Sequence, residues 1–251
     1  MMYDTFHLHI NEKEIKNAKI ALVPGPPERV PLIAEHADKF YPIRQNREFN
    51  TYLAYINDQP VIITSTGIGG PSVSIAIEEL AQLGIETFIR VGTSGAIQPH
   101  ITIDSVIITE AAVRLDGASY HFAPASFPAV ASFECTQALK QAAEKNNITS
   151  YIGISASSDT FYPGQERYDT HTGKILHSLK NSYQQWQELG VLNYEMETAT
   201  LFTMSRALHV KAGCVTGVII NRTKKNEIPH QYSLAEENAI KVAIDSCKQL
   251  T

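Results

Sequence analysis

Hydrophobic residues along the chain follow two alternating patterns. Short runs rich in β-branched residues, such as those ending at Val23 and Val91, alternate with longer segments whose apolar residues recur every three or four positions. The first pattern is typical of buried strands and the second of amphipathic helices. Their alternation predicts parallel strands joined by crossover helices. We expect strands over residues 19–23, 61–65, 87–91, 104–109, 153–156 and 211–220.

Helical periodicity is clearest over residues 72–83, where Val73, Ile77 and Leu80 fall on one face. Residues 133–145, 198–208 and 234–250 have similar spacing. No internal repeat, low-complexity tract or linker composition divides the chain. We therefore expect residues 1–251 to form a single α/β domain, a size that buries a sizeable core.

Glycines and polar residues gather just after the predicted strands. In open α/β sheets this is where ligands bind, so we expect the functional site there. A glycine cluster considered alone, such as 67–70, is as well explained by turn chemistry. The clusters lie at Gly25 and at residues 67–70, 92–95, 157–167 and 221–222.

The charge and cysteine content exclude several classes of protein. A net charge of -5 argues against a nucleic-acid surface, which needs clustered Lys and Arg. Cys135, Cys214 and Cys247 are odd in number and far apart, so they indicate neither a disulfide framework nor a zinc site. The polar N-terminal residues and the lack of a long apolar run predict no signal peptide and no membrane span. We expect a cytoplasmic protein.

The segment 158–168 carries candidate chemistry for a flat, polar ring. Phe161 offers an aromatic face, Gln165 an amide with donors and an acceptor, and Arg167 a guanidinium with donors only. This combination suits a pyrimidine such as uracil, whose carbonyls and ring N–H need both kinds of partner. An ordinary turn around Pro163-Gly164 explains the segment equally well.

Two strand ends offer partners for an anion. Gly25 lets backbone N–H approach closely, Arg29 and Arg90 supply charge-assisted hydrogen bonds, and the Thr93 hydroxyl can donate once more. Together they suit inorganic phosphate, although each arginine alone could equally form a surface salt bridge. The chain has neither a Walker loop nor the dinucleotide-binding glycine pattern.

Two carboxylates flank a methionine just before the predicted helix at 198–208. Glu197 can accept hydrogen bonds from two adjacent ribose hydroxyls, and Met196 offers a soft apolar floor beneath a sugar. The alternative is an acidic helix N-terminus stabilised by the helix dipole.

These motifs, in this order and spacing, resemble the uridine phosphorylase family of the nucleoside phosphorylase superfamily almost from end to end. The resemblance implies a single-domain three-layer sandwich with a mixed central sheet flanked by helices. It also implies reversible phosphorolysis of uridine to uracil and ribose 1-phosphate, with phosphate as co-substrate and no required cofactor. The matching stretches are Phe6-His7-Leu8, Val23-Pro24-Gly25 with Arg29, Arg47-Glu48-Phe49, Asn221-Arg222-Thr223 and residues 65–72, 90–99, 114–122, 155–169 and 194–197.

The resemblance also implies a role for each matching residue. His7 and Arg47 would cross a dimer interface to complete the neighbouring subunit's site, in a hexamer built from three dimers. Glu195 would hold the network of Gln165 and Arg167. Catalytic roles fall to Arg29, Arg90, Thr93, Gln165, Arg167, Glu197 and His7; phosphate contacts to Gly25, Arg29, Arg47, Arg90 and Thr93; ribose contacts to His7, Thr93, Met196 and Glu197; base contacts to Ser94, Phe161, Gln165, Arg167, Glu195 and Arg222.

In some relatives, positions matching Glu48, Ile68 and Ser72 form a monovalent-cation site between subunits, so K⁺ is the candidate cation here. A structural salt-bridge role for the same residues is at least as well supported by the sequence.

Two departures from the family pattern stand out. The family commonly reads Gly-Asp-Pro where this chain reads Gly25-Pro26-Pro27, so an acid that would orient an arginine is missing. One extra residue falls within Lys224-Lys225-Asn226, which changes the closing flap.

Several functions remain open from the sequence alone. A purine nucleoside phosphorylase would have an acid at Asn221, a nucleoside hydrolase would lack the phosphate arginines, and a binding module would lack turnover. Preference among uridine, thymidine and 2'-deoxyuridine stays open as well.

Overall fold

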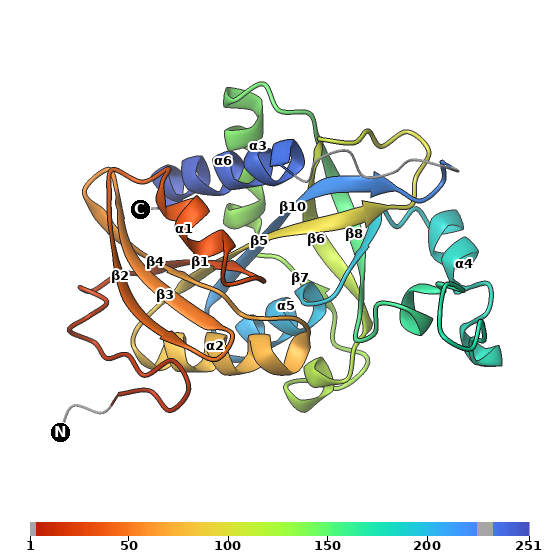
Figure 1. Ribbon diagram of the computed structural model, residues 1–251, viewed down its shortest axis with the longest axis horizontal. Coiled ribbons are helices and arrows are strands. Elements are labelled where there is room, and N and C mark those ends of the chain that lie inside the picture. The colour runs from red at the N-terminus through yellow and green to blue at the C-terminus, as the bar shows by residue number, and fades with distance from the viewer. Residues whose placement is uncertain (1–3, 225–232, 251) are drawn as a thin grey trace.

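A mixed β-sheet separates two layers of helices in the computed structural model, which describes residues 4–224 and 233–250 (Figure 1). Both layers pack on the same sheet, so we propose that residues 1–251 form one domain. The three-layer arrangement implied by the family resemblance is confirmed. One layer contains α1 (Arg29–Ala34), α3 (Phe133–Lys145) and α6 (Ser233–Leu250), and the other α2 (Gly70–Gln82) and α5 (Thr198–Ala207).

The sheet runs in the order β10-β6-β8-β9-β5-β1-β4-β3-β2, with β7 paired to β6. Because β10 also pairs with β5, the strands β5, β10, β6, β8 and β9 form a closed ring. β4, β1, β5 and β10 are mutually parallel, so their carboxyl ends meet at one edge. The strands are β1 (Ile20–Pro24), β2 (Lys39–Asn46), β3 (Phe49–Ile56), β4 (Gln59–Thr64), β5 (Thr87–Ala96), β6 (Val106–Leu115), β7 (Ala129–Val130), β8 (Ser150–Ser158), β9 (Asn193–Glu195) and β10 (Lys211–Asn221).

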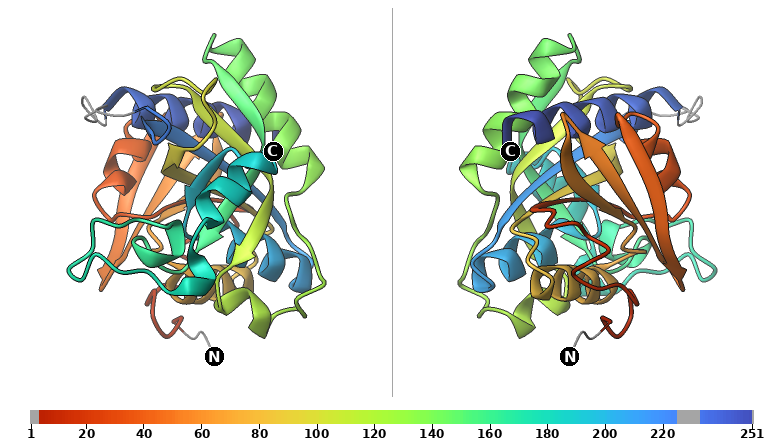
Figure 2. Two further views of the ribbon diagram at one scale, coloured as in Figure 1. Left: turned by 90° about the vertical axis from the view of Figure 1, so that its right-hand side faces the viewer. Right: turned by 90° about the vertical axis from the view of Figure 1, so that its left-hand side faces the viewer.

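A third group of short helices lies beside the ring. Figures 1 and 2 show α4 (Ser182–Glu188) and the loops around it at the end of the molecule opposite β2. The remaining short turns are 3₁₀ helices at Ala118–His121, Pro163–Gln165 and His177–Leu179. Within the described residues, no helix has both the length and the apolar character needed to cross a membrane.

The strands and helices predicted from the hydrophobic pattern are confirmed, and the sheet is mixed, as the family resemblance implied. β3 is antiparallel to both β2 and β4, and β6 is antiparallel to β10. β2 was missed because its apolar residues, Phe40, Tyr41 and Ile43, do not alternate with polar ones and Pro42 interrupts them. β3 and the short elements α1, α4, β7 and β9 were missed as well.

Alternation along β5 determines which side of the sheet each residue faces. Ile89 and Val91 pack in the core beneath α1, α3 and α6, whereas Phe88 packs in the core beneath α2 and α5. Since side chains alternate in a strand, Arg90 must face the side of Phe88. A guanidinium is thereby placed inside the layer that contains α5.

Truncating Leu139 tests the core beneath α3 and α6. This side chain is fully buried there. We expect Leu139→Ala to lower the free energy of unfolding by about 2–5 kcal/mol, because it leaves a cavity. The exposed Gln141→Ala on the same helix should change it by less than about 0.5 kcal/mol. Urea denaturation measures both, and equal effects would contradict this packing.

Candidate active site

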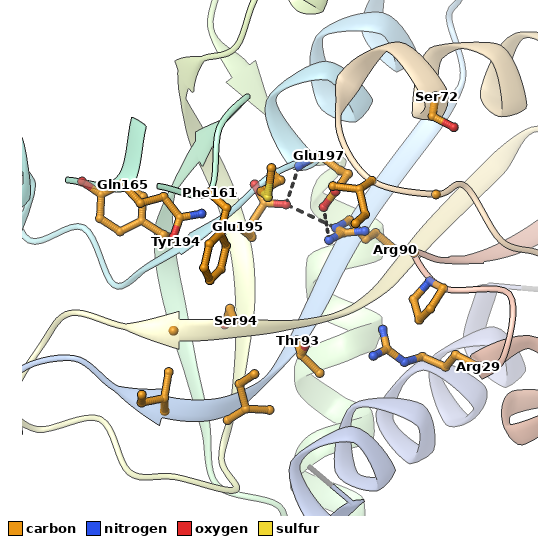
Figure 3. A pocket seen from close by; sticks show the side chains of 18 of the residues that line it. Arg29, Ser72, Arg90, Thr93, Ser94, Phe161, Gln165, Tyr194, Glu195 and Glu197 are labelled. Atoms are coloured by element: carbon orange, nitrogen blue, oxygen red, sulfur yellow. Dashed lines mark hydrogen bonds and ion pairs between the residues drawn. The ribbon is translucent and has the colours of Figure 1, made fainter. Parts of the chain in front are cut away.

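A cavity of about 760 Å³ opens at the carboxyl ends of the parallel strands (Figure 3). Most of the residues that the sequence predicted for the site line this one cavity, although they come from segments far apart in the chain. Those residues are Gly25, Arg29, Glu48, Ile68, Ser72, Arg90, Thr93, Ser94, Phe161, Gln165, Arg167, Glu195, Met196 and Glu197.

Arg90 is buried between two carboxylates. Its Nε donates to Glu195 Oε2 at 3.2 Å, and its Nη2 donates to Glu197 Oε2. Burial opposes the charged form of Arg90, but the charges of Glu197 and Glu195 prevail and raise its pKa above the ordinary value. Nη1 of Arg90 is buried and has no hydrogen-bond partner among the described residues. The Arg90 side chain also lines the cavity, so its positive charge can attract an anion bound there.

Glu197 is held at the start of α5 by two donors. Its Oε1 accepts from the Gly69 N–H at 2.7 Å, and its Oε2 accepts from Arg90. Gly69 has a φ of 88°, a conformation that favours glycine and that aims this N–H at the carboxylate. Burial raises the pKa of Glu197 even though Arg90 opposes the rise.

The family resemblance implied that Glu195 holds Gln165 and Arg167, but its carboxylate has other partners in this structure. Its carboxylate accepts from Arg90 and from the backbone N–H groups of Glu197 and Thr198, at 2.9 and 2.9 Å for the closer oxygen. It therefore caps α5 and neutralises Arg90, because free N–H groups at a helix start attract a carboxylate. The residue also lines the cavity.

Arg29 enters the cavity from the opposite wall. Its Nη1 donates to the Val91 carbonyl at 3.1 Å, and its Nε donates to Glu236 of α6. Gly25, Pro26 and Pro27 precede it on the same wall. Figure 3 shows the Arg29 guanidinium extended toward Thr93. Two cationic groups on different elements thus border one end of the cavity.

The other end of the cavity is aromatic and amide-rich. The Arg167 guanidinium stacks on Phe161, with Cζ 4.1 Å from the ring centroid, and its Nε donates to Gln165 Oε1 at 3.3 Å. Tyr194 lines the cavity beside them. Ser94 also lines it, although its hydroxyl is shared with Thr216 at 2.9 Å.

Arg222 supports this end from outside the cavity lining. Its Nη2 donates to the Gln165 carbonyl at 2.9 Å, and its Cζ lies 4.7 Å from the Tyr183 ring centroid. Burial lowers the pKa of both Arg167 and Arg222, and for Arg222 the neighbouring Arg167 lowers it further.

Asn221 does not face the cavity. Its amide donates to the carbonyls of Gln98 and Ile101, at 2.9 and 2.7 Å, and its oxygen accepts from Thr223. Ile219 and Ile220 line the cavity instead. The sequence pattern missed these two because apolar residues at a strand end are indistinguishable from core.

His7 and Arg47 do not line the main cavity within one chain. They border a second pocket of about 490 Å³ together with Phe6 and Asn46. Glu79 fixes His7, since its carboxylate accepts from the His7 backbone N–H and lies 2.7 Å from Nδ1. The predicted crossing of these residues into a neighbouring subunit stays a prediction.

Glu48 and Ser72 meet at the rim of the cavity. The Ser72 hydroxyl donates to Glu48 Oε1 at 2.9 Å, and Ile68 beside them is exposed. Two side-chain oxygens are therefore close enough to share one weakly bound cation. Among the described residues, no group of three His, Cys, Asp or Glu side chains could hold a metal ion. Of the predicted flap, Lys225 and Asn226 lie outside the described residues.

Comparison with known proteins agrees with this architecture. The model of the family described as "Phosphorylase superfamily" matches residues 19–249. The chain is 53% identical to a protein named uridine phosphorylase from Haemophilus influenzae over 99% of each chain, and 53% identical to one of the same name from Escherichia coli over 98% of each. It is 31% identical to a guanosine phosphorylase from Halorubrum lacusprofundi, over 97% of this chain and 98% of that protein. With almost its full length matched in this way, the chain belongs to the phosphorylase superfamily.

Proposed function

We propose that this protein catalyses the reversible phosphorolysis of uridine, giving uracil and ribose 1-phosphate. The observation that carries the proposal is one cavity that has the guanidinium groups of Arg29 and Arg90 at one end and Gln165 with Arg167 at the other. An anion subsite and a flat polar subsite in one cavity suit a phosphate and a nucleobase on either side of a sugar.

Phosphate is held by cationic and backbone donors. Arg29 and Arg90 supply charge-assisted hydrogen bonds, Gly25 allows a close backbone approach, and Thr93 adds a hydroxyl. Glu195 and Glu197 keep the Arg90 side chain fixed, so its guanidinium is already in place before phosphate arrives. Phosphate is the co-substrate, and the mechanism requires no other cofactor.

Ribose lies between the two subsites. Glu197 keeps lone pairs beyond its bonds to Arg90 and Gly69, and these can accept from two ribose hydroxyls. Met196 supplies apolar contact to the sugar ring. His7, fixed by Glu79, would reach the sugar from a neighbouring subunit.

The base is held by stacking and by complementary hydrogen bonds. Phe161 faces the ring, while Gln165 and Arg167 meet its carbonyl and N–H edge. Arg222 supports the Gln165 backbone and adds a second cationic group near the departing base.

The chemistry proceeds by direct displacement. An oxygen of phosphate bonds to the anomeric carbon while the bond from that carbon to N1 of uracil breaks. The bonding electron pair leaves with uracil, and its carbonyl oxygens carry negative charge until N1 takes a proton from solvent. Arg167 stabilises that charge, and Arg29 and Arg90 keep the attacking phosphate in line.

The names of the relatives support uridine over a purine nucleoside. The two proteins that are 53% identical are named uridine phosphorylase, whereas the guanosine phosphorylase is only 31% identical. In this chain, Asn221 is neutral and turned away from the cavity, so it supplies no acid for a purine ring nitrogen.

The assembly, the cation and the location are further parts of the proposal. We expect a homo-oligomer with shared sites, in which His7 and Arg47 complete the neighbouring cavity, and a hexamer of three dimers as its form. The Glu48 and Ser72 oxygens, with the Ile68 carbonyl, would hold K⁺ between subunits. Three buried cysteines without a disulfide suit the reducing cytoplasm.

Phosphate dependence tests the anion subsite. We expect uracil release from uridine to require phosphate, and Arg90→Lys to lower kcat/KM for phosphate about 100-fold, because Lys keeps the charge but lacks the planar fork. Lys is chosen over Ala so that Glu195 and Glu197 are not left without a cation. Undiminished release in phosphate-free buffer would contradict the assignment.

Base preference tests the amide and guanidinium pair. We expect uridine to be turned over about 1,000-fold faster than inosine, because a site built for particular polar edges rejects a ligand that leaves them unpaired. Gln165→Ala should reduce uridine turnover strongly, whereas Gln184→Ala, an exposed glutamine on α4, should not. Comparable kcat/KM values for the two nucleosides would exclude uridine specificity.

Subunit mixing tests the shared site. If Arg47 enters from a neighbour and Arg90 acts within its own chain, mixing the impaired Arg47→Ala and Arg90→Lys proteins should restore activity. Each mixed dimer would contain one site with both defects and one with neither. Light scattering checks the assembly and labelled subunits check the exchange. Verified exchange without recovery, or a fully active monomer, would count against shared sites.

A further inference from the structure

Glu236 does not line the cavity, but its carboxylate contacts Arg29, which does. It lies in the first turn of α6, 207 residues from Arg29 in sequence, and accepts a hydrogen bond from the Arg29 Nε. The Arg29 and Glu236 side chains are only 10% and 20% exposed. Solvent and salt therefore screen this ion pair less than a surface pair.

Of the two remaining nitrogens of Arg29, one donates to the protein and the other is left for the cavity. Nη1 donates to the Val91 carbonyl of β5 at 3.1 Å. Nη2 has no hydrogen-bond partner among the described residues, and the guanidinium is extended along the cavity toward Thr93 (Figure 3). Because the guanidinium is planar, fixing Nε and Nη1 also fixes the direction of Nη2.

We propose that Glu236 is a positioning residue for the phosphate subsite: it holds Arg29 so that Nη2 is directed at phosphate. The inference rests on the proposed function, because it assigns a role within that site. A long, flexible side chain would otherwise lose rotamer freedom each time phosphate binds, and the ion pair removes that loss in advance.

Two other roles for the same ion pair give different results. If the pair is only a structural bridge between α6 and α1, its loss would lower stability and change KM for phosphate and for uridine to the same extent. A purely electrostatic role would weaken phosphate binding in the native protein, since a carboxylate beside the subsite repels the anion, and its removal would tighten binding. If Glu236 positions Arg29, its removal should weaken phosphate binding and leave uridine binding unchanged.

The adjacent Glu237 provides a matched control. It lies on the same turn of α6 but pairs with His36 at 3.4 Å and with Lys241 at 3.1 Å, and it does not contact Arg29. Glu237→Ala removes the same charge from the same helix without disturbing the phosphate subsite.

The test compares Glu236→Ala, Glu236→Gln and Glu237→Ala in the full chain. We measure KM for phosphate and for uridine, together with the dissociation constant of inorganic phosphate by calorimetry. Glu236→Ala should raise KM and the dissociation constant for phosphate about tenfold and leave KM for uridine unchanged. Glu236→Gln keeps an oxygen that accepts from Nε, so phosphate KM should stay within about threefold of the native value. Glu237→Ala should leave both constants unchanged.

A double-mutant cycle separates positioning from indirect effects. In an Arg29→Ala background, Glu236→Ala should have no further effect on the phosphate constants, because the side chain that Glu236 holds in the described structure is gone. Should Glu236→Ala fail to fold, Glu236→Asp, whose carboxylate is one methylene short of Nε, should raise phosphate KM in the same direction.

Additive effects in the cycle, tighter phosphate binding, or an equal rise in KM for uridine would each overturn the proposal. If the native protein binds phosphate but releases no uracil, the proposed function fails, while the phosphate dissociation constants still decide the role of Glu236.

Discussion

The ion pairs of Arg90 with Glu195 and Glu197 are the constraint on which the rest of the site depends. A guanidinium buried in the layer of α5 is tolerated only if carboxylates meet it, since an unpaired buried charge is strongly destabilising. Those carboxylates come from β9 and from the start of α5, and Glu195 uses the same oxygens to cap that helix. The relative positions of β5, β9 and α5 are therefore set by charge as well as by packing. The substrate meets groups supported by strands and a helix, a more rigid frame than loops provide.

The arginines at the two ends of the cavity have different kinds of partner. At the phosphate end each arginine has a carboxylate partner, Glu195 and Glu197 for Arg90 and Glu236 for Arg29. At the base end, no ion pair within the described chain joins Arg167 or Arg222 to a carboxylate, and both guanidinium groups lie over aromatic rings. The first arrangement fixes donors for an anion that arrives with full charge. The second leaves electrostatic attraction available for negative charge that develops only as the base departs.

Much of the architecture follows from local sequence, and the exceptions share a physical cause. The helix at residues 133–145 and the strand that contains Arg90 follow from apolar spacing, although β5 continues to Ala96, beyond the end expected at residue 91. β2 could not be found because its few apolar residues are contiguous and interrupted by Pro42, so they show no strand alternation. The direction of Asn221, the partner of Glu195 and the contact of Glu236 with Arg29 depend on how distant elements dock. Such contacts leave no trace in the spacing of neighbouring residues, so a sequence pattern names the residues of a site more readily than their partners.

The exposure of β2 also bears on how the sheet ends. The ring formed through the pairing of β10 with β5 hides one end of the sheet, whereas β2 has a described partner, β3, on one side only. An edge strand is a template on which other chains can add and aggregate. Here the strand contains Lys39 and Arg44, which repel a similar strand, and Pro42, which lacks a ladder N–H and sits where the pairing register shifts. Phe40 and Tyr41 are exposed on this strand, so Lys39, Pro42 and Arg44 are the residues that oppose extension of the open edge.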